Sequence, residues 1–94
     1  RLVLDAERPV VVDFSAEWCP PCQRMAPILA AAAADHAERV ATVVVDVDAH
    51  GALAARYQVE YLPTLAVFVD GELVDTRTGF HDRQALDALY QAAE

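Results

Sequence analysis

Two cysteines separated by two prolines, Cys19-Pro20-Pro21-Cys22, follow an apolar segment that contains a single acid, Asp13. A Cys-X-X-Cys pair that comes directly after a buried strand and opens a helix is typical of a redox-active dithiol. The alternative is a structural disulfide at a tight turn. Such a disulfide closes a short ring, constrains little of the unfolded chain, and stabilises the fold less than a long-loop bridge does. The pattern therefore favours redox chemistry, with Asp13 as a proton acceptor nearby.

The position of Cys19 predicts that it is the nucleophile of the pair. At the N-cap of a helix, unpaired backbone N–H groups and the helix dipole favour negative charge, which lowers a thiol pKa below its free value of ~8.5. Cys22 lies one helical turn further on, where it can resolve a mixed disulfide, and we expect it to be more buried. Pro20 and Pro21 suit the first helical turn, but they remove two donors. The Cys22 N–H is then the main backbone group that stabilises the Cys19 thiolate, which we expect to be less stabilised than with a glycine at position 20.

The elements that hold the dithiol follow from the apolar pattern. Strands are predicted at Val10–Phe14 and Val40–Asp48, each as a buried run rich in β-branched residues. A helix between them, over residues 22–37, is expected to kink at Pro27 and continue. Two strands joined by a helical crossover are parallel neighbours in one sheet.

The second half of the chain predicts a helix, a hairpin and a final helix. The short helix spans Ala49–Tyr57. Strands at Thr64–Val69 and Glu72–Thr78 are joined by a two-residue Asp-Gly turn. Asp82 is the predicted N-cap of the final helix. Its apolar stripe consists of Leu86, Leu89 and Tyr90.

Composition excludes several classes of function. The chain has 94 residues, 55% of them apolar, which is enough for one domain with a single core. Its net charge of −8 argues against a nucleic-acid or anionic-membrane partner. Two cysteines are too few for a secreted disulfide framework or a zinc site. The three histidines, His36, His50 and His81, lack metal-ligand spacing and are expected to face solvent. No stretch reaches the ~18 uninterrupted apolar residues of a membrane span.

Several segments resemble the thioredoxin family. "VVDFSAEWCPPC" resembles the family's active-site strand and motif, and "MAPILAAAA" its active-site helix. "YQVEYLPTLAVFVDGE" is similar to the segment with the family's cis-proline and hairpin, and "TRTGF" to its glycine loop. The resemblance runs from Val10 to the end. It implies that Arg1–Arg8 is a remnant of the family's first helix and that the strand before it is missing, either because the sequence is truncated or because this is a shortened member. It implies a thioredoxin-like α/β three-layer sandwich, a mixed β-sheet flanked by helices, as one domain over residues 1–94.

Carried over residue by residue, the resemblance implies a role for each site residue. Cys19 would be the attacking thiolate and Cys22 the resolving thiol, and the two would form the redox disulfide. Asp13 would be the buried carboxylate beneath Cys22 that accepts its proton. Pro63 would be cis and lie against the disulfide, leaving the backbone of Leu62 free to pair with a substrate strand. The substrate groove would be rimmed by Trp18, Pro21, Tyr61, Leu62, Gly79 and Phe80.

Two departures from the family pattern bear on the chemistry. Val44 stands where many thioredoxins carry a lysine near the buried acid. Without that countercharge, desolvation is expected to raise the pKa of Asp13. Tyr61 stands where a small residue is common, which predicts a narrower or more aromatic groove.

The implied function is reduction of protein disulfides through a mixed disulfide. The resemblance also implies recycling by an NADPH-dependent thioredoxin reductase, no bound metal or organic cofactor, a monomeric state and a cytoplasmic location. Three alternatives stay open. The first is an oxidase or isomerase of an oxidising compartment. The second is a tryparedoxin- or nucleoredoxin-like reductase with the same Trp-Cys-Pro-Pro-Cys motif. The third is a non-catalytic module that holds a partner strand around Tyr61–Pro63.

Overall fold

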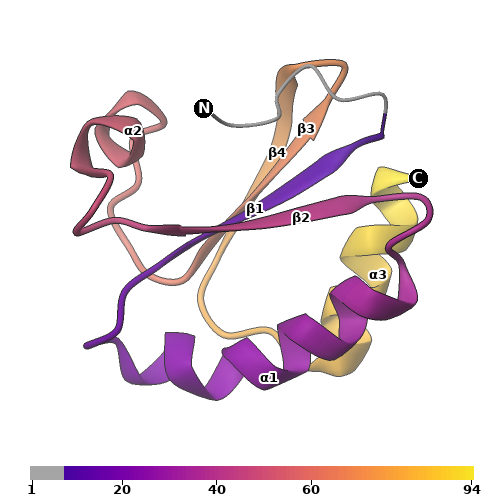
Figure 1. The fold of residues 1–94 in the computed structure, drawn as a ribbon, viewed down its shortest axis with the longest axis horizontal. Helices are drawn as coiled ribbons and strands as arrows, with labels where there is room; N and C mark the ends of the chain where they lie inside the picture. Colours follow the sequence, from indigo (N-terminus) through magenta and orange to yellow (C-terminus); the bar gives the residue numbers. More distant parts are fainter. Residues whose placement is uncertain (1–7) are drawn as a thin grey trace.

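The computed structural model describes residues 8–94, so the expected helix remnant at Arg1–Arg8 lies outside the described residues except for Arg8. The elements are β1 (Val10–Ser15), α1 (Pro20–Asp35), β2 (Ala41–Asp46), α2 (Gly51–Arg56), β3 (Thr64–Val69), β4 (Glu72–Thr78) and α3 (Arg83–Ala93). The strands form one sheet in the order β2-β1-β3-β4. Helices α1 and α3 lie on one side of this sheet and α2 on the other (Figure 1). The predicted mixed sheet flanked by helices is confirmed.

Strand β1 lies inside the sheet and is covered on both faces. It pairs in parallel with β2, as predicted, and antiparallel with β3. Its alternate residues enter two cores, because successive strand side chains point to opposite faces. The core beneath α1 and α3 is formed by Val11, Met25, Leu29, Ala32, Val40, Leu65, Val67, Leu86, Leu89 and Tyr90. The core on the α2 side is formed by Val10, Val12, Phe14, Val45, Ala54, Ala66 and Phe68.

Strand β2 differs from the prediction of a buried strand. It is shorter than expected and ends the sheet on one side within the described part of the chain. Most of its residues are partly exposed, and Val44 is 62% exposed. A β-branched run therefore indicated a strand correctly, but it did not distinguish an inner strand from an edge strand.

The start of α1 agrees with the sequence prediction. Cys19 is its N-cap, and the two prolines occupy the first two helical positions. Pro27 lies inside the helix, which continues beyond it to Asp35. The helix begins two residues before the predicted Cys22 because prolines are compatible with a first turn that needs no N–H donors.

Local turn and cap signals are also confirmed. Asp70 and Gly71 have φ angles of 54° and 79°, the left-handed pair that a two-residue hairpin turn requires. The hairpin strands have the predicted bounds. At α3, the Asp82 carboxylate accepts a hydrogen bond of 2.9 Å from the Ala85 N–H. The helix α2, by contrast, is shorter than predicted and covers only Gly51–Arg56.

The prediction that all three histidines face solvent is wrong for His36. Its ring is stacked on Tyr90, with centroids 5.0 Å apart and planes 4° from parallel. Its two ring nitrogens lie 3.0 Å from the carboxylate of Asp87 and 3.3 Å from that of Glu94. His36 thus joins the end of α1 to α3. His81 is half-buried, and His50 is exposed as expected.

Candidate active site

The cysteine pair lies at the N-terminus of α1, just after the short loop that follows β1. Cys19 and Cys22 form a disulfide with their Cα atoms 5.3 Å apart. Both side chains are buried, Cys19 at 4% and Cys22 at 2% exposure, so the expected difference in burial is small. The Cys22 N–H donates a hydrogen bond of 3.3 Å to the Cys19 sulfur. Because the two prolines between them carry no N–H, this is the donor that a Cys19 thiolate would use, in addition to the helix dipole.

Asp13 is a buried acid on the α1 side of the sheet. It follows Val11 by two residues and therefore faces the same side, where Val11 packs in the core with Met25 of α1. Cys22 precedes Met25 by one turn on the buried face of the same helix. Asp13 is thus directed toward the end of α1 that carries the disulfide.

The environment of Asp13 disfavours its charge. The side chain is 3% exposed, and its Oδ1 has no hydrogen-bond partner among the described residues. Burial raises the pKa of Asp13 to about 6, as predicted from desolvation. Its neighbour in register on β2 is Val44, which supplies no countercharge.

A proline-containing loop closes the other side of the site. The Leu62–Pro63 peptide is cis, as the resemblance implies, and Pro63 is fully buried. The Pro63 carbonyl accepts a hydrogen bond of 2.8 Å from the Gly79 N–H. Leu62 packs against the cluster that contains both cysteines, and none of its backbone groups bonds to another backbone group within residues 8–94. The backbone of Leu62 is therefore available to a partner strand.

A groove of about 510 Å³ lies beside the disulfide. Its lining residues are Trp18, Cys19, Pro20, Pro21, Val47, Ala54, Val59, Glu60, Tyr61 and Leu62. Four of the predicted rim residues are in this set, namely Trp18, Pro21, Tyr61 and Leu62.

Gly79 and Phe80, also predicted at the rim, are not among the residues that line this groove. Gly79 instead holds the Pro63 carbonyl. Phe80 is 43% exposed, and the guanidinium of Arg24 lies over its ring, 5.8 Å from the centroid. Gly79 is thus joined to the cis-proline loop at the site, while the predicted rim role of Gly79 and Phe80 stays a prediction.

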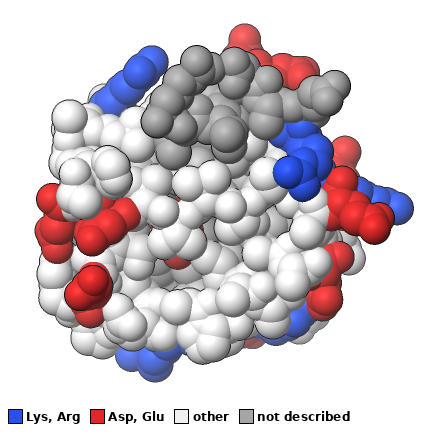
Figure 2. Space-filling model, viewed as in Figure 1, with Lys and Arg blue, Asp and Glu red and all other residues white. Residues whose placement is uncertain are grey.

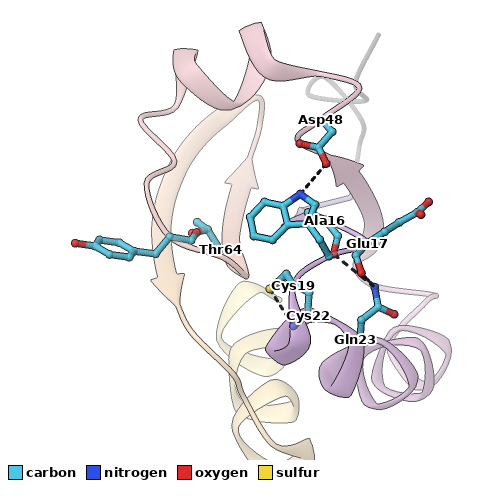
Figure 3. The surroundings of a disulfide bond; sticks show 9 residues. Ala16, Glu17, Cys19, Cys22, Gln23, Asp48 and Thr64 are labelled. Carbon is cyan, nitrogen blue, oxygen red and sulfur yellow. Dashed lines mark hydrogen bonds between the residues drawn. A yellow bond between two sulfur atoms is a disulfide. The ribbon is translucent and has the colours of Figure 1, made fainter.

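Sequence reasoning missed the carboxylates around the groove. The indole Nε1–H of Trp18 donates a hydrogen bond of 2.8 Å to Asp48 (Figure 3). The Asp48 N–H in turn donates to the Asp46 carboxylate at 2.9 Å. Glu60 lines the groove directly. Its place next to the predicted rim residue Tyr61 could have indicated it, whereas nothing in the sequence connects Asp48 with Trp18, thirty positions earlier.

A buried Cys-X-X-Cys disulfide at a helix N-terminus, beside a buried acid and a cis-proline loop, is the arrangement of thiol–disulfide oxidoreductases. Residues 1–92 match the family model described as Thioredoxin. The chain is 43% identical over 87 residues to thioredoxin C-2 of Corynebacterium nephridii, covering 93% of this chain and 81% of that protein. It is 44% identical over 84 residues to a thioredoxin of Streptomyces clavuligerus, covering 89% and 78%. The chain belongs to the thioredoxin family.

Solved structures agree with this assignment. The fold is similar to that of Plasmodium falciparum thioredoxin, with a TM-score of 0.90 and 30% identity over 98% of this chain and 88% of that one. Fasciola hepatica thioredoxin is also similar, with a TM-score of 0.88 and 36% identity over 96% and 85%. With its redox cysteine pair, the protein is a thiol–disulfide oxidoreductase of the protein-disulfide reductase type.

No helix within residues 8–94 is long and apolar enough to cross a membrane. No group of histidine, cysteine and acidic side chains there is arranged to hold a metal ion.

Proposed function

We propose that Cys19 attacks protein disulfides and that Cys22 completes their reduction. The Cys19 thiolate attacks one sulfur of the substrate disulfide, forms a mixed disulfide and expels the other substrate sulfur as a thiolate. Cys22 then attacks the Cys19 sulfur, which re-forms the Cys19–Cys22 bond and releases the second substrate sulfur. Two electrons pass from the dithiol to the substrate. The observation that carries this assignment is the Cys22 N–H directed at the Cys19 sulfur, 3.3 Å away, at the start of α1.

Asp13 is the proton acceptor in this proposal. The second attack requires the Cys22 thiol to lose its proton in a buried site. An acid with a pKa of about 6 is a better acceptor near neutral pH than an ordinary carboxylate, and it is still largely ionised there. Its position on the α1 side of the sheet, with an unpartnered Oδ1, supports this role.

The groove is the substrate site in this proposal. An extended substrate segment pairs with the free backbone of Leu62, with its disulfide over Cys19 and against Pro63. Main-chain pairing of this kind binds a strand without reading its sequence. Trp18 is held at the rim by its bond to Asp48 and provides an apolar wall.

Regeneration of the dithiol needs an external electron donor. We assign this step to an NADPH-dependent thioredoxin reductase, which fits the family's named members. A protein that gives electrons to disulfides works in a reducing compartment, and the cytoplasm is such a compartment. The protein acts as a monomer in this scheme, because each molecule carries a complete dithiol site.

The test is reduction of insulin coupled to NADPH oxidation through a thioredoxin reductase. Wild-type protein is expected to support NADPH consumption, and Cys19→Ser is expected to abolish it. Cys22→Ser is expected to accumulate a mixed disulfide with the substrate, because its resolving thiol is gone. A Cys22→Ser protein that forms no such adduct, while Cys19→Ser does, would reverse the assigned roles.

A redox titration distinguishes reduction from oxidation. A reductase of this class has a potential near about −270 mV, and an oxidase or isomerase one of about −180 mV or above. A binding module without catalysis would retain its partner after Cys19→Ser and would give no NADPH consumption as wild type.

A further inference from the structure

A second pocket adjoins the redox groove. Its volume is about 710 Å³. It is lined by Tyr57, Gln58, Val59, Glu60, Tyr61, Thr64, Leu73, Thr76 and Thr78. Val59, Glu60 and Tyr61 line both this pocket and the redox groove. The two cavities therefore meet along one short segment of chain, directly before Leu62.

The floor of the second pocket is the part of β4 that faces the α2 side. Thr76 and Thr78 are the register partners of Ala66 and Thr64 on β3. Ala66 belongs to the core on the α2 side, so these two threonines point to that side as well. They are nevertheless exposed, as is Leu73 at 42%. This face of β4 is thus open and bounded on one side by the segment that leads to Leu62.

The lining has one kind of charge. Among the residues that line this pocket, Glu60 is the only charged one. The remaining polar groups are one amide and the hydroxyls of tyrosine and threonine. Arg77 lies between Thr76 and Thr78 in β4, so it points to the opposite face, where it pairs with Asp75 at 3.1 Å.

Tyr61 offers a second element for binding a cation. Its side chain is 69% exposed, so the ring is accessible to a ligand. The other ring of the pocket, Tyr57, already has the guanidinium of Arg56 over it at 5.5 Å. Within the described part of the chain, the Tyr61 ring contacts neither a cation nor another ring. An ammonium or guanidinium group between the Glu60 carboxylate and the Tyr61 ring would gain both an ion pair and a cation–π contact.

The surrounding field has the same sign. Asp48 accepts the indole N–H of Trp18, which lines the redox groove together with Glu60, and Asp46 accepts the Asp48 N–H. In the view of Figure 2, carboxylates stand at the left edge, where β1 and β2 end, and no basic side chain lies among them. With a net charge of −8, the protein attracts basic segments to this edge.

We infer that the second pocket is a substrate subsite for a lysine or arginine side chain two residues from the reactive substrate cysteine. In a strand paired with Leu62, residues two apart lie on the same side, about 7 Å from each other. When the substrate cysteine lies over Cys19, the substrate residue two positions away therefore lies beside Glu60 and Tyr61. A long basic side chain at that position reaches past these two residues into the second pocket. This inference rests on the proposed reduction of protein disulfides, and it names the substrates: disulfides flanked by basic residues.

The test uses a pair of disulfide peptides that differ only in lysine or glutamine two residues from the cysteine, on each side in turn. Wild type is expected to reduce the lysine peptide with a kcat/KM about 5- to 10-fold above that of the glutamine peptide, mainly through KM. The preference is expected to decrease at high salt. In Glu60→Gln it is expected to fall to about 2-fold or less.

Glu72→Gln is the matched control. Like Glu60→Gln, it removes one negative charge, but Glu72 is on β4 and lines neither pocket. This variant is therefore expected to keep the full preference for the lysine peptide. Thr76→Lys places a cation of the protein's own in the pocket and is expected to abolish the preference. Equal reduction of the two peptides by wild type, or an unchanged preference in Glu60→Gln, would overturn the inference. Loss of insulin reduction by wild type would instead refute the proposed function on which it rests.

Discussion

Replacing Asp13 by asparagine removes a buried ionisable group at nearly constant size. In the wild type, burial raises its pKa from 3.8 to about 6. The folded state therefore holds this proton more tightly than the unfolded state does. Stability from this source is full below pH 3.8 and is lost as the pH rises through about 6. At about 1.36 kcal/mol for each pKa unit, ionised Asp13 lowers the free energy of unfolding by about 3 kcal/mol above neutral pH.

The variant lacks this titration. Its free energy of unfolding relative to wild type is therefore expected to rise by about 2.4 kcal/mol between about pH 4 and about pH 8, because the unfolded wild type is already partly ionised at pH 4. A constant difference in packing between the amide and the acid cancels in this comparison. The measurement is urea unfolding of the oxidised proteins, followed by circular dichroism at both pH values.

A variant without a titrating group provides the control. Val67→Ala truncates a side chain in the core on the α1 side and is expected to destabilise the protein equally at both pH values. A change below about 1 kcal/mol for Asp13→Asn would refute the reasoning, since the raised pKa requires more. Asp13→Asn is also expected to reduce insulin about 10- to 100-fold more slowly than wild type near neutral pH, because it lacks the proton acceptor for Cys22.

Three further substitutions follow from contacts of the described residues. Val44→Lys puts a cation on the strand position in register with Asp13 and is expected to lower the pKa of Asp13. NMR titration of the Asp13 carboxyl carbon would measure this pKa. An unchanged value would mean that the exposed ammonium stays in solvent. Asp48→Ala removes the acceptor of the Trp18 indole and is expected to raise KM for peptide disulfides about 2- to 5-fold with little change in kcat. Equal kinetics would show that the rim needs no anchor. His36→Ala removes the ring stack on Tyr90 and the hydrogen bonds that join His36 to Asp87 and Glu94. It is expected to lower the midpoint of thermal unfolding by about 4–8 °C, measured by calorimetry.

The His36 contacts also predict a dependence on acid. Hydrogen bonds with His36 and Arg83 lower the pKa of Asp87 from 3.8, and hydrogen bonds with Arg39 and His36 lower that of Glu94 from 4.5. An acid whose pKa is lowered in the folded state stabilises the protein at pH values above the acid's ordinary pKa. This stabilisation is lost as the pH falls through the pKa of the folded state. Wild type is therefore expected to lose stability on acidification in this range more steeply than His36→Ala, which lacks one partner of both acids. Parallel acid titrations of the two proteins would contradict this.

Local signals in the sequence predicted local structure well. The Asp-Gly pair defines the hairpin turn by its own backbone preferences, and the bounds of β3 and β4 followed from it. The N-cap position of Cys19 followed from the two prolines behind it. These features depend on residues within a few positions of one another, so the sequence alone is sufficient to predict them.

Features that depend on distant parts of the chain were not predicted. The edge position of β2 depends on which strands pair, and a run of valines is compatible with an inner strand or an edge strand. The contacts of His36 involve residues more than fifty positions away on α3. The groove needs Val47 and Ala54 from the α2 side, which no motif connects with the cysteines. The family resemblance supplied the cis bond at Pro63, which an isolated Leu-Pro pair does not predict.

The two prolines of the active-site motif have a consequence for spectroscopy. Because Pro20 and Pro21 carry no amide proton, the Cys22 amide is the one backbone N–H between the two sulfurs, and it is directed at Cys19. Its proton chemical shift therefore responds directly to the charge on that sulfur, with no neighbouring amide to share the effect. A single cross-peak can thus report the ionisation of Cys19 during a pH titration of the reduced protein.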